Sequence, residues 1–202
     1  MSLPQEHSYL TLGNASKGFF KDKGSKFYGY GFNVSSTDMV DEKLALIAKE
    51  HPKARHVCYA YRLGLTHDVF RTNDDGEPSG TAGKPILRQI DSNDLTDTLI
   101  AVVRYFGGTL LGTSGLINAY KLTTIDVVEN NKIVSKPIEK IVTITFTYAV
   151  MPQVMNFVKS QPVNILNQTF EANCSLIVSV NTINYDSFVI QLNKIENLEC
   201  IV

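Results

Sequence analysis

The chain has 202 residues, of which 44% are hydrophobic and 19% are charged, a composition that excludes a disordered or fibrous protein. It carries 19 Lys and Arg against 20 Asp and Glu, so it lacks the basic excess of proteins that bind nucleic acid over a wide surface, and any RNA contact is expected to be local. A chain of this length can bury about 70% of its unfolded surface, enough for one large or two small domains without a metal or disulfide.

The cysteines and the hydropathy pattern predict a cytoplasmic protein. Cys58, Cys174 and Cys200 are odd in number, far apart and in no C-x-x-C pairing, which argues against a disulfide framework and a structural zinc site. No apolar run approaches the roughly 18 residues that span a bilayer, and no basic region followed by an apolar stretch opens the chain. We therefore expect neither secretion nor membrane insertion.

Composition changes near residues 133–137. All 13 glycines and all five arginines precede Ile133, whereas the chain after it is rich in β-branched residues and Asn. Formal charges are 15 positive and 15 negative in residues 1–135, and 4 positive against 5 negative in residues 136–202, so neither part is a charged tail. This change predicts two domains, residues 1–134 and residues 135–202.

Hydrophobic periodicity predicts an α+β first domain. Residues 27–34 alternate between two faces, as in a half-buried strand, and Phe19 and Phe20 are expected in its hairpin partner. Helical spacing over residues 37–51 ends at Pro52, which cannot continue a helix. The other expected elements of this domain are strands over residues 55–63, 69–71 and 99–106 and a short helix over residues 85–90.

The hydrophobic pattern of the second domain predicts the element order β-α-β-β-α, which is that of a ferredoxin-like sandwich. A final apolar stretch follows the second helix. The expected strands cover residues 141–148, 165–171 and 175–180, and the expected helices cover residues 151–160 and 186–195.

The stretch RYFGGTLLGTSG at residues 104–115 is the first candidate site. It connects a near-continuous apolar strand, expected to be central, to a helix that Ser114 is expected to cap. Backbone N–H groups of Gly107 and Gly108 and the positive helix end can converge on phosphate or carboxylate. The stretch lacks the P-loop lysine and the G-x-G-x-x-G spacing, so it specifies no nucleotide class. A tight strand-to-helix turn would need the same glycines.

The stretch NDDGEPSGTAGKP at residues 73–85 is the second candidate site. Asp74, Asp75 and Glu77 lie in a loop too rich in Gly and Pro for regular structure, where carboxylates can bind Mg²⁺ or act as a general base. A solvated acidic turn is the alternative. Cations flank both stretches, where they can clamp an anion or neutralise the acidic turn. The residues expected to bind an anion are Arg71, Ser79, Thr81, Lys84, Arg104, Gly107, Gly108 and Ser114.

One histidine and one group of aromatic residues have two interpretations each. His56 lies on the strand predicted over residues 55–63, where a satisfied core histidine is the preferred interpretation and a ligand-facing acid or base is the alternative. Tyr28, Tyr30 and Phe32 are able to stack on bases, but without interleaved Lys or Arg they are interpreted as core residues.

Three motifs jointly resemble the signatures of the IMPACT/YigZ family, and the spacing between them also matches. They are HVCYAYRLG (residues 56–64), RTNDDGEPSGTAGKPIL (71–87) and AVVRYFGGTLLGTSGLINAY (101–120). With the hairpin KGSKFYGY (23–30), the resemblance covers about residues 17–130. The chain from about residue 137 resembles, in pattern more than in motif, the appended domain of YigZ-type members.

The resemblance implies a fold for each domain. The first would be an α+β domain of the type shared by a ribosomal-protein domain, RNase PH and the GHMP kinases, with a left-handed βαβ crossover. The second would be ferredoxin-like, similar to the last domain of elongation factor G. Eukaryotic IMPACT proteins regulate translation by competing for the activator of a general-control kinase, and they carry an additional RWD domain that this chain is expected to lack. We therefore do not transfer the kinase role, and fold kinship with kinases and nucleases is analogy only.

Two main functional hypotheses follow. The first is a cytoplasmic regulatory or binding protein connected with translation, without a cofactor, that binds RNA phosphate or another anion and has the ribosome, RNA or translation factors as partners. The second is an Mg²⁺-dependent phosphotransferase or phosphohydrolase, in which Asp75 and Glu77 hold the metal and His56 transfers a proton. A protein-interaction module is a third. The anion site requires both glycine-rich stretches to share one pocket, and the sequence leaves open whether the chain is an enzyme and what its oligomeric state is.

Overall fold

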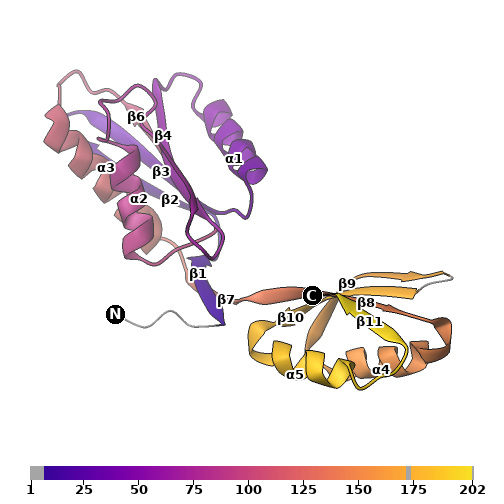
Figure 1. Cartoon of the computed structure of the whole chain (residues 1–202). Helices are drawn as coiled ribbons and strands as arrows, with labels where there is room; N and C mark the ends of the chain where they lie inside the picture. Colours follow the sequence, from indigo (N-terminus) through magenta and orange to yellow (C-terminus); the bar gives the residue numbers. More distant parts are fainter. Residues whose placement is uncertain (1–6, 172–173, 202) are drawn as a thin grey trace. The chain divides into compact units, whose positions relative to one another are not determined.

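The computed structural model describes residues 7–171 and 174–201, and the chain divides into two compact units (Figure 1). The first unit spans residues 9–136, and the second starts at Pro137 and includes His7 and Ser8. Each unit combines helices with an antiparallel sheet, which confirms the α+β class. A separate two-stranded sheet pairs β1 (Ser8–Leu12) with β7 (Ile133–Pro137). The named fold type of each unit stays a prediction.

The first unit is built on a five-stranded sheet in the order β2-β3-β6-β4-β5, in which every neighbouring pair is antiparallel. Its strands are β2 (Ser16–Asp22), β3 (Ser25–Asn33), β6 (Thr98–Tyr105), β4 (His56–Leu63) and β5 (Val69–Asn73). Leu99, Ala101 and Val103 of β6 pack into one hydrophobic cluster, and Ile100 and Val102 pack into another. The near-continuous apolar sequence of β6 therefore reflects a central strand that is buried on both faces, as expected.

Helices cover both faces of this sheet (Figure 1). On one face, α1 (Thr37–Glu50) contributes Val40 and Ile47 to the cluster that contains Leu99. On the other face, α2 (Gly83–Ser92) and α3 (Gly112–Glu129) share a cluster with Ile100. The helix α3 lies directly on the β2–β3 hairpin, where a Cβ at Gly18 would be 2.6 Å from the backbone nitrogen of Val127, so only glycine fits.

The starts of two helices differ in how they are capped. Ser36 caps α1, because its side chain accepts a hydrogen bond from the backbone N–H of Met39. In contrast, α3 begins two residues before Ser114, at Gly112, which has a φ of 71°. Its N-cap is Leu111, without a side-chain hydrogen bond, so the predicted capping by Ser114 is wrong. Ser114 lies exposed in the first turn instead.

The second unit has the chain order β-α-β-β-α-β, and its sheet has the order β11-β8-β10-β9. The strands are β8 (Glu139–Phe146), β9 (Val163–Phe170), β10 (Cys174–Asn181) and β11 (Leu198–Ile201). The helices are α4 (Met151–Ser160), preceded by the short η1 (Tyr148–Val150), and α5 (Thr182–Leu192). The final apolar stretch of the sequence is thus the edge strand β11. The second predicted helix begins four residues earlier than expected, because Asn181 caps it through the N–H of Ile183.

The three cysteines, all within the described residues, are free thiols, and two of them, Cys58 and Cys174, are buried. Among residues 7–171 and 174–201, the structure contains no helix that is both long and apolar enough to cross a membrane.

Candidate anion-binding site

The two glycine-rich stretches meet through a buried ion pair. Arg104, near the end of β6, is 7% exposed, and Glu77, in the loop before α2, is 8% exposed. Arg104 Nη1 donates to both carboxylate oxygens of Glu77, at 2.7 and 2.9 Å. Because a buried charge is strongly disfavoured without a partner, this pair fixes the loop over residues 74–83 against the central strand.

A chain of hydrogen bonds extends this ion pair into the core. Tyr120 Oη of α3 donates to Glu77 Oε1 at 2.9 Å, and Cys58 Sγ of β4 lies 3.2 Å from Tyr120 Oη. Burial raises the pKa of the Cys58 thiol to about 12, and burial also raises the pKa of Tyr120. Both groups are therefore neutral at physiological pH, and Cys58 is a buried structural thiol rather than a reactive one.

The acidic loop uses its other carboxylates internally. Asp74 accepts hydrogen bonds from the backbone N–H groups of Gly80, Ala82 and Gly83 at 2.7 to 3.0 Å. Burial opposes ionisation of Asp74, but these three donors outweigh it and lower the pKa of its carboxyl. Asp75 Oδ2 accepts from the backbone N–H of Val57 at 2.6 Å. These carboxylates therefore organise the loop and the start of α2.

This arrangement does not form the magnesium site considered from the sequence. Both oxygens of Glu77 face Arg104, and an oxygen of Asp75 is bound to a backbone donor. Within the described part of the chain, no group of three or more His, Cys, Asp or Glu side chains is placed to hold a metal ion. Metal binding by Asp75 and Glu77 stays a prediction that would require these internal bonds to break.

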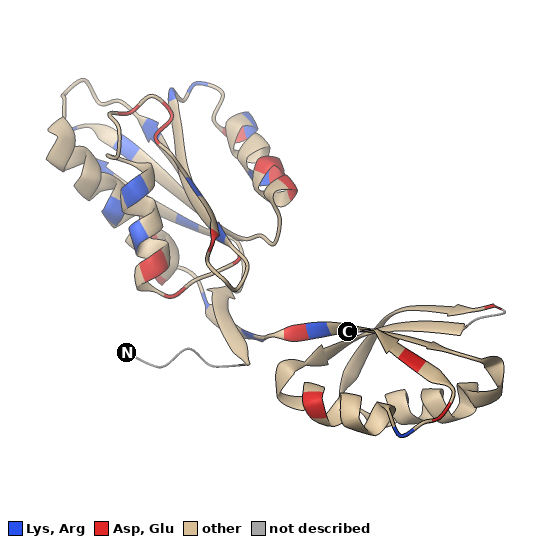
Figure 2. Ribbon diagram, in the orientation of Figure 1, with Lys and Arg blue, Asp and Glu red and all other residues tan. Residues whose placement is uncertain are grey.

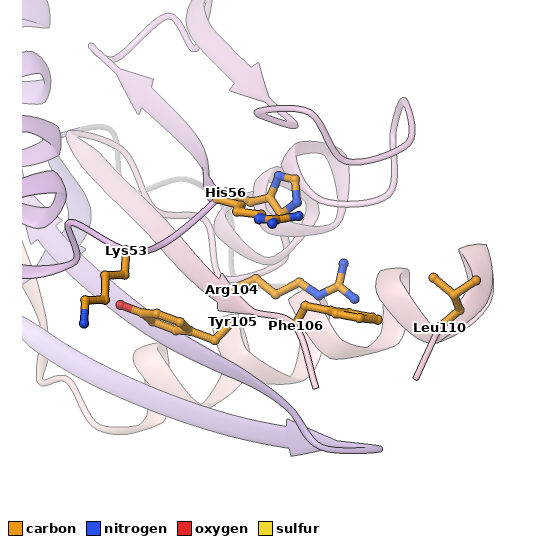
Figure 3. A pocket seen from close by; sticks show the side chains of 7 residues that line it. Lys53, His56, Arg104, Tyr105, Phe106 and Leu110 are labelled. Atoms are coloured by element: carbon orange, nitrogen blue, oxygen red, sulfur yellow. The ribbon is translucent and has the colours of Figure 1, made fainter. Parts of the chain in front are cut away.

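A cavity of about 540 Å³ lies beside the ion pair (Figure 3). Its lining residues are Lys53, Arg55, His56, Arg104, Tyr105, Phe106 and Leu110, and we call it the cationic cavity. Lys53 and Arg55 come directly before β4, and His56 begins that strand and is paired in register with Arg104 of β6. Two segments about 50 residues apart in the sequence are thus brought to one surface by the β4–β6 pairing, as expected for non-local strand pairing.

The free positive charge of this cavity comes from Lys53 and Arg55. Glu77 neutralises Arg104, whereas Lys53 and Arg55 are not buried and form no ion pair within the described chain. Figure 2 shows that Lys and Arg are common in the first unit, whereas the second unit carries few charged residues. The cavity therefore favours an anionic ligand.

Two nitrogen atoms of residues that line the cavity have no hydrogen-bond partner within the described residues. Arg104 Nε is buried and has no hydrogen-bond partner within the described residues. His56 Nδ1 lies 2.7 Å from the carbonyl oxygen of Asp75, which only accepts, so Nδ1 carries the proton and donates. His56 Nε2 has no protein partner in the described part of the chain. His56 is half-buried at the cavity and is not the core histidine that the sequence favoured.

The other residues predicted to bind an anion lie elsewhere in the described chain. Of those eight, Arg104 alone lines the cationic cavity. Arg71 is exposed on β5, Ser79 is exposed in the acidic loop, and Thr81 donates its hydroxyl to the Pro78 carbonyl. Lys84 lies beside Gly80, where its charge stabilises the carboxylate of Asp74. Their roles in anion binding stay predictions that the position of the cavity does not support.

The glycines after β6 position the loop. Gly107 donates its N–H to Ser25 Oγ at 3.1 Å, and a Cβ at Gly107 would clash with the backbone of Gly24. The amide of Gly107 is therefore occupied, and this glycine is needed for close backbone approach. Gly108 has a φ of 88° with open space around it. Five lining residues were not predicted from the sequence: Lys53, Arg55, Tyr105, Phe106 and Leu110. The basic pair flanking Ala54 just before His56 was an available signal for the first two of them.

The first unit matches a known family model. The model described as the Impact N-terminal domain matches residues 23–128, a range that includes all residues of the cationic cavity. A similar protein from Bacillus subtilis, the IMPACT family member YvyE, is 35% identical over 150 residues, which cover 74% of this chain and 69% of that protein. An IMPACT family member from Haemophilus influenzae is 33% identical over 177 residues, which cover 85% of this chain and 84% of that protein.

A solved structure extends this similarity to both units. It is described as the crystal structure of a hypothetical protein, and its TM-score with this chain is 0.80 at 26% sequence identity. The match covers 97% of this chain and 97% of the other. The two-unit architecture is therefore shared with a protein of known structure.

Proposed function

This chain belongs to the IMPACT family, and from that membership we propose that it is a regulatory protein connected with translation that binds a phosphate-bearing ligand, RNA in particular, in the cationic cavity. The link to translation rests on the family resemblance, because eukaryotic IMPACT proteins regulate translation. The ribosome, RNA and translation factors are the proposed partners, and the cytoplasm is the proposed location.

The observation that supports a phosphate-bearing ligand is the group of cations and unpartnered nitrogen atoms around one cavity. Lys53 and Arg55 supply unpaired positive charge, and Arg104 Nε is a buried donor without an acceptor among the described residues. Buried donors are nearly always satisfied in folded proteins, so an unpaired one beside a cavity favours a ligand or water that accepts. Phosphate oxygens accept several such charge-assisted hydrogen bonds at once.

No arrangement among the described residues favours the Mg²⁺-dependent enzyme over this function. The carboxylates that would hold the metal, Asp75 and Glu77, already accept internal hydrogen bonds. The unpaired charges of Lys53 and Arg55 support binding of an anion at this cavity instead.

Salt titrations of RNA binding test this proposal. Fluorescence anisotropy with a labelled single-stranded RNA is measured at several KCl concentrations for the wild type, Lys53→Ala and Arg55→Ala. We expect each variant to bind RNA more weakly than the wild type. The negative slope of log K against log salt should become less steep by about 0.7 for each phosphate that the variant no longer neutralises. Arg71→Ala is the matched control, because Arg71 is an exposed arginine of the same sheet outside the cavity. Equal weakening by Arg71→Ala would contradict the assigned site, and a wild type that binds no RNA would contradict the assigned ligand.

A further inference from the structure

A second cavity, of about 530 Å³, adjoins the cationic cavity. Its lining residues are Gly24, Lys26, Tyr28, His51, Tyr105 and Phe106, and we call it the aromatic cavity. Tyr105 and Phe106 line both cavities, so the two cavities adjoin at these residues, and we call the pair of cavities the groove. Lys26 lines the aromatic cavity, Lys53 and Arg55 line the cationic cavity, and the two cavities share the aromatic residues Tyr105 and Phe106.

We propose that this groove binds single-stranded RNA, with one unstacked base in the aromatic cavity against Phe106 and with phosphates at Lys26, Lys53 and Arg55. The inference rests on the proposed function and deepens it, because it specifies the strand state of the RNA and a second subsite. Grooves that combine cations along the backbone with aromatic rings for the bases are the common solution for binding single strands.

The position of Phe106 is the main observation for a base-binding subsite. Its side chain is 56% exposed, although a phenylalanine gains by burial, and it lies where the two cavities meet. The Arg104 guanidinium lies 5.8 Å from its ring centroid, and the next residue, Gly107, is held against the β2–β3 turn. The backbone that carries the ring is therefore already fixed. Stacking a base on the ring should cost little conformational entropy, because few rotatable bonds of the protein become ordered on binding.

The other rings of the aromatic cavity are also fixed. Tyr105 packs edge-to-face on Tyr28, with centroids 5.9 Å apart, and His51 lies 5.6 Å from Tyr28 and 5.7 Å from Tyr105. Lys26, on the same strand as Tyr28, lines this cavity and is exposed. Tyr28 was interpreted as a core residue because no Lys or Arg is interleaved with the aromatic residues of its strand, but Lys26 of that strand lines the same cavity, and the fold brings Lys53 and Arg55 to the adjoining one.

Hydrogen bonding gives the groove an acceptor for a base. Tyr30 Oη donates to Glu50 Oε1 at 3.1 Å, so its oxygen accepts from His51 Nε2, 2.5 Å away. His51 Nδ1 is then unprotonated and accepts from Tyr105 Oη at 2.9 Å. Burial lowers the pKa of His51, which agrees with this neutral form. The lone pairs of Tyr105 Oη are therefore available to an amino group of a base in the groove.

Binding of three ten-nucleotide probes to the full chain tests this inference: a mixed-sequence single-stranded RNA, an abasic sugar–phosphate strand of about the same length, and the RNA duplex. We expect the single-stranded RNA to bind most tightly. Phe106→Ala should weaken its binding by about 5- to 150-fold, the equivalent of one stacked base, and should leave the abasic strand unaffected. Because Phe106 is exposed, the variant should fold normally, which its melting temperature checks.

Phe70→Ala is the matched control. Phe70 is 53% exposed and lies against an arginine, Arg62, at 5.2 Å, but it lines neither cavity. If Phe70→Ala bound single-stranded RNA as weakly as Phe106→Ala, the inference would be overturned. Equal binding of all three probes, with no effect of Phe106→Ala, would also overturn the inference. If Lys53→Ala nevertheless weakened binding of these probes, the proposed function would stand without the base subsite. A wild type that binds none of the probes would overturn both.

Discussion

Arg104 links the buried network of the first unit to its surface cavity. Its Nη1 is bound to Glu77, its Nε has no acceptor within the described chain, and its guanidinium lies 5.6 Å from the ring of Phe27 and 5.8 Å from that of Phe106. A lysine would not reproduce these contacts, because its compact ammonium group lacks the planar guanidinium that lies near both rings while its Nη1 binds the carboxylate. Glu77 is therefore a positioning residue for Arg104.

Replacing Glu77 by Met should destabilise the protein by about 3–5 kcal/mol, because Arg104 then keeps a buried charge without a partner. Adding Arg104→Met to this variant should restore much of the stability, since two apolar side chains of similar volume can replace a buried ion pair. Urea unfolding with an unchanged m-value measures both effects. The control is Lys17→Ala, which removes the exposed Lys17–Glu50 pair and should change the free energy of unfolding by about 1 kcal/mol or less. A double variant less stable than Glu77→Met would contradict this explanation.

At the scale of elements, the start of α2 depends on an aspartate far from its first turn in sequence. Asp74 lies nine residues before Gly83, yet its carboxylate accepts from the N–H groups of Gly80, Ala82 and Gly83. The loop between them folds back so that one side chain replaces the missing cap at Ala82. The acidic residues that suggested a metal site thus have a structural use.

Asp74→Ala should destabilise the protein by about 1–2 kcal/mol at neutral pH, as expected when a helix cap is removed. The pKa of Asp74 is lowered in the folded protein below its ordinary value of 3.8. Its contribution is therefore complete above pH 3.8 and is lost as the pH falls through the lower, folded value. Urea unfolding of the wild type and the variant from about pH 7 to about pH 2.5 should show a stability difference that shrinks in acid. Asp68→Ala, at an exposed position, should show a small difference without this trend, and a gap that widens in acid would contradict the assignment.

Element types follow from the sequence, whereas the site depends on how strands pair. Local periodicity is sufficient to predict β6 and to place α4 at residues 151–160, since it records which face each residue buries. The pairing of His56 with Arg104 is set by the register between β4 and β6, which no local pattern encodes. Phe106 was overlooked for the same reason, because it is the first loop residue after a strand and becomes part of a groove only through its neighbours.

At the scale of the whole molecule, the arginines are confined to the first unit, and each unit has its own hydrophobic core. All five arginines lie in the first unit, which also contains every residue of both cavities. The second unit has its own hydrophobic cluster, centred on residues such as Ile144, Leu176 and Phe188, which shares no residue with the two clusters described for the first unit. The proposed RNA groove should therefore not depend on the packing of the second unit.

Phe188→Ala tests this independence in the full chain. Phe188 is 1% exposed, so its removal should destabilise the second unit by about 3–5 kcal/mol. Urea unfolding followed by circular dichroism should then show an early transition. The affinity for single-stranded RNA in the absence of urea should change by no more than about twofold, because the cluster that contains Phe188 shares no residue with the clusters of the first unit. Phe27→Ala is the counterpart in the first unit, where the buried ring lies beside Arg104, and it should weaken both stability and RNA binding. Loss of RNA binding in Phe188→Ala would contradict this independence. The core of the second unit would then be required for RNA binding, although the residues that line both cavities all lie within residues 24–110.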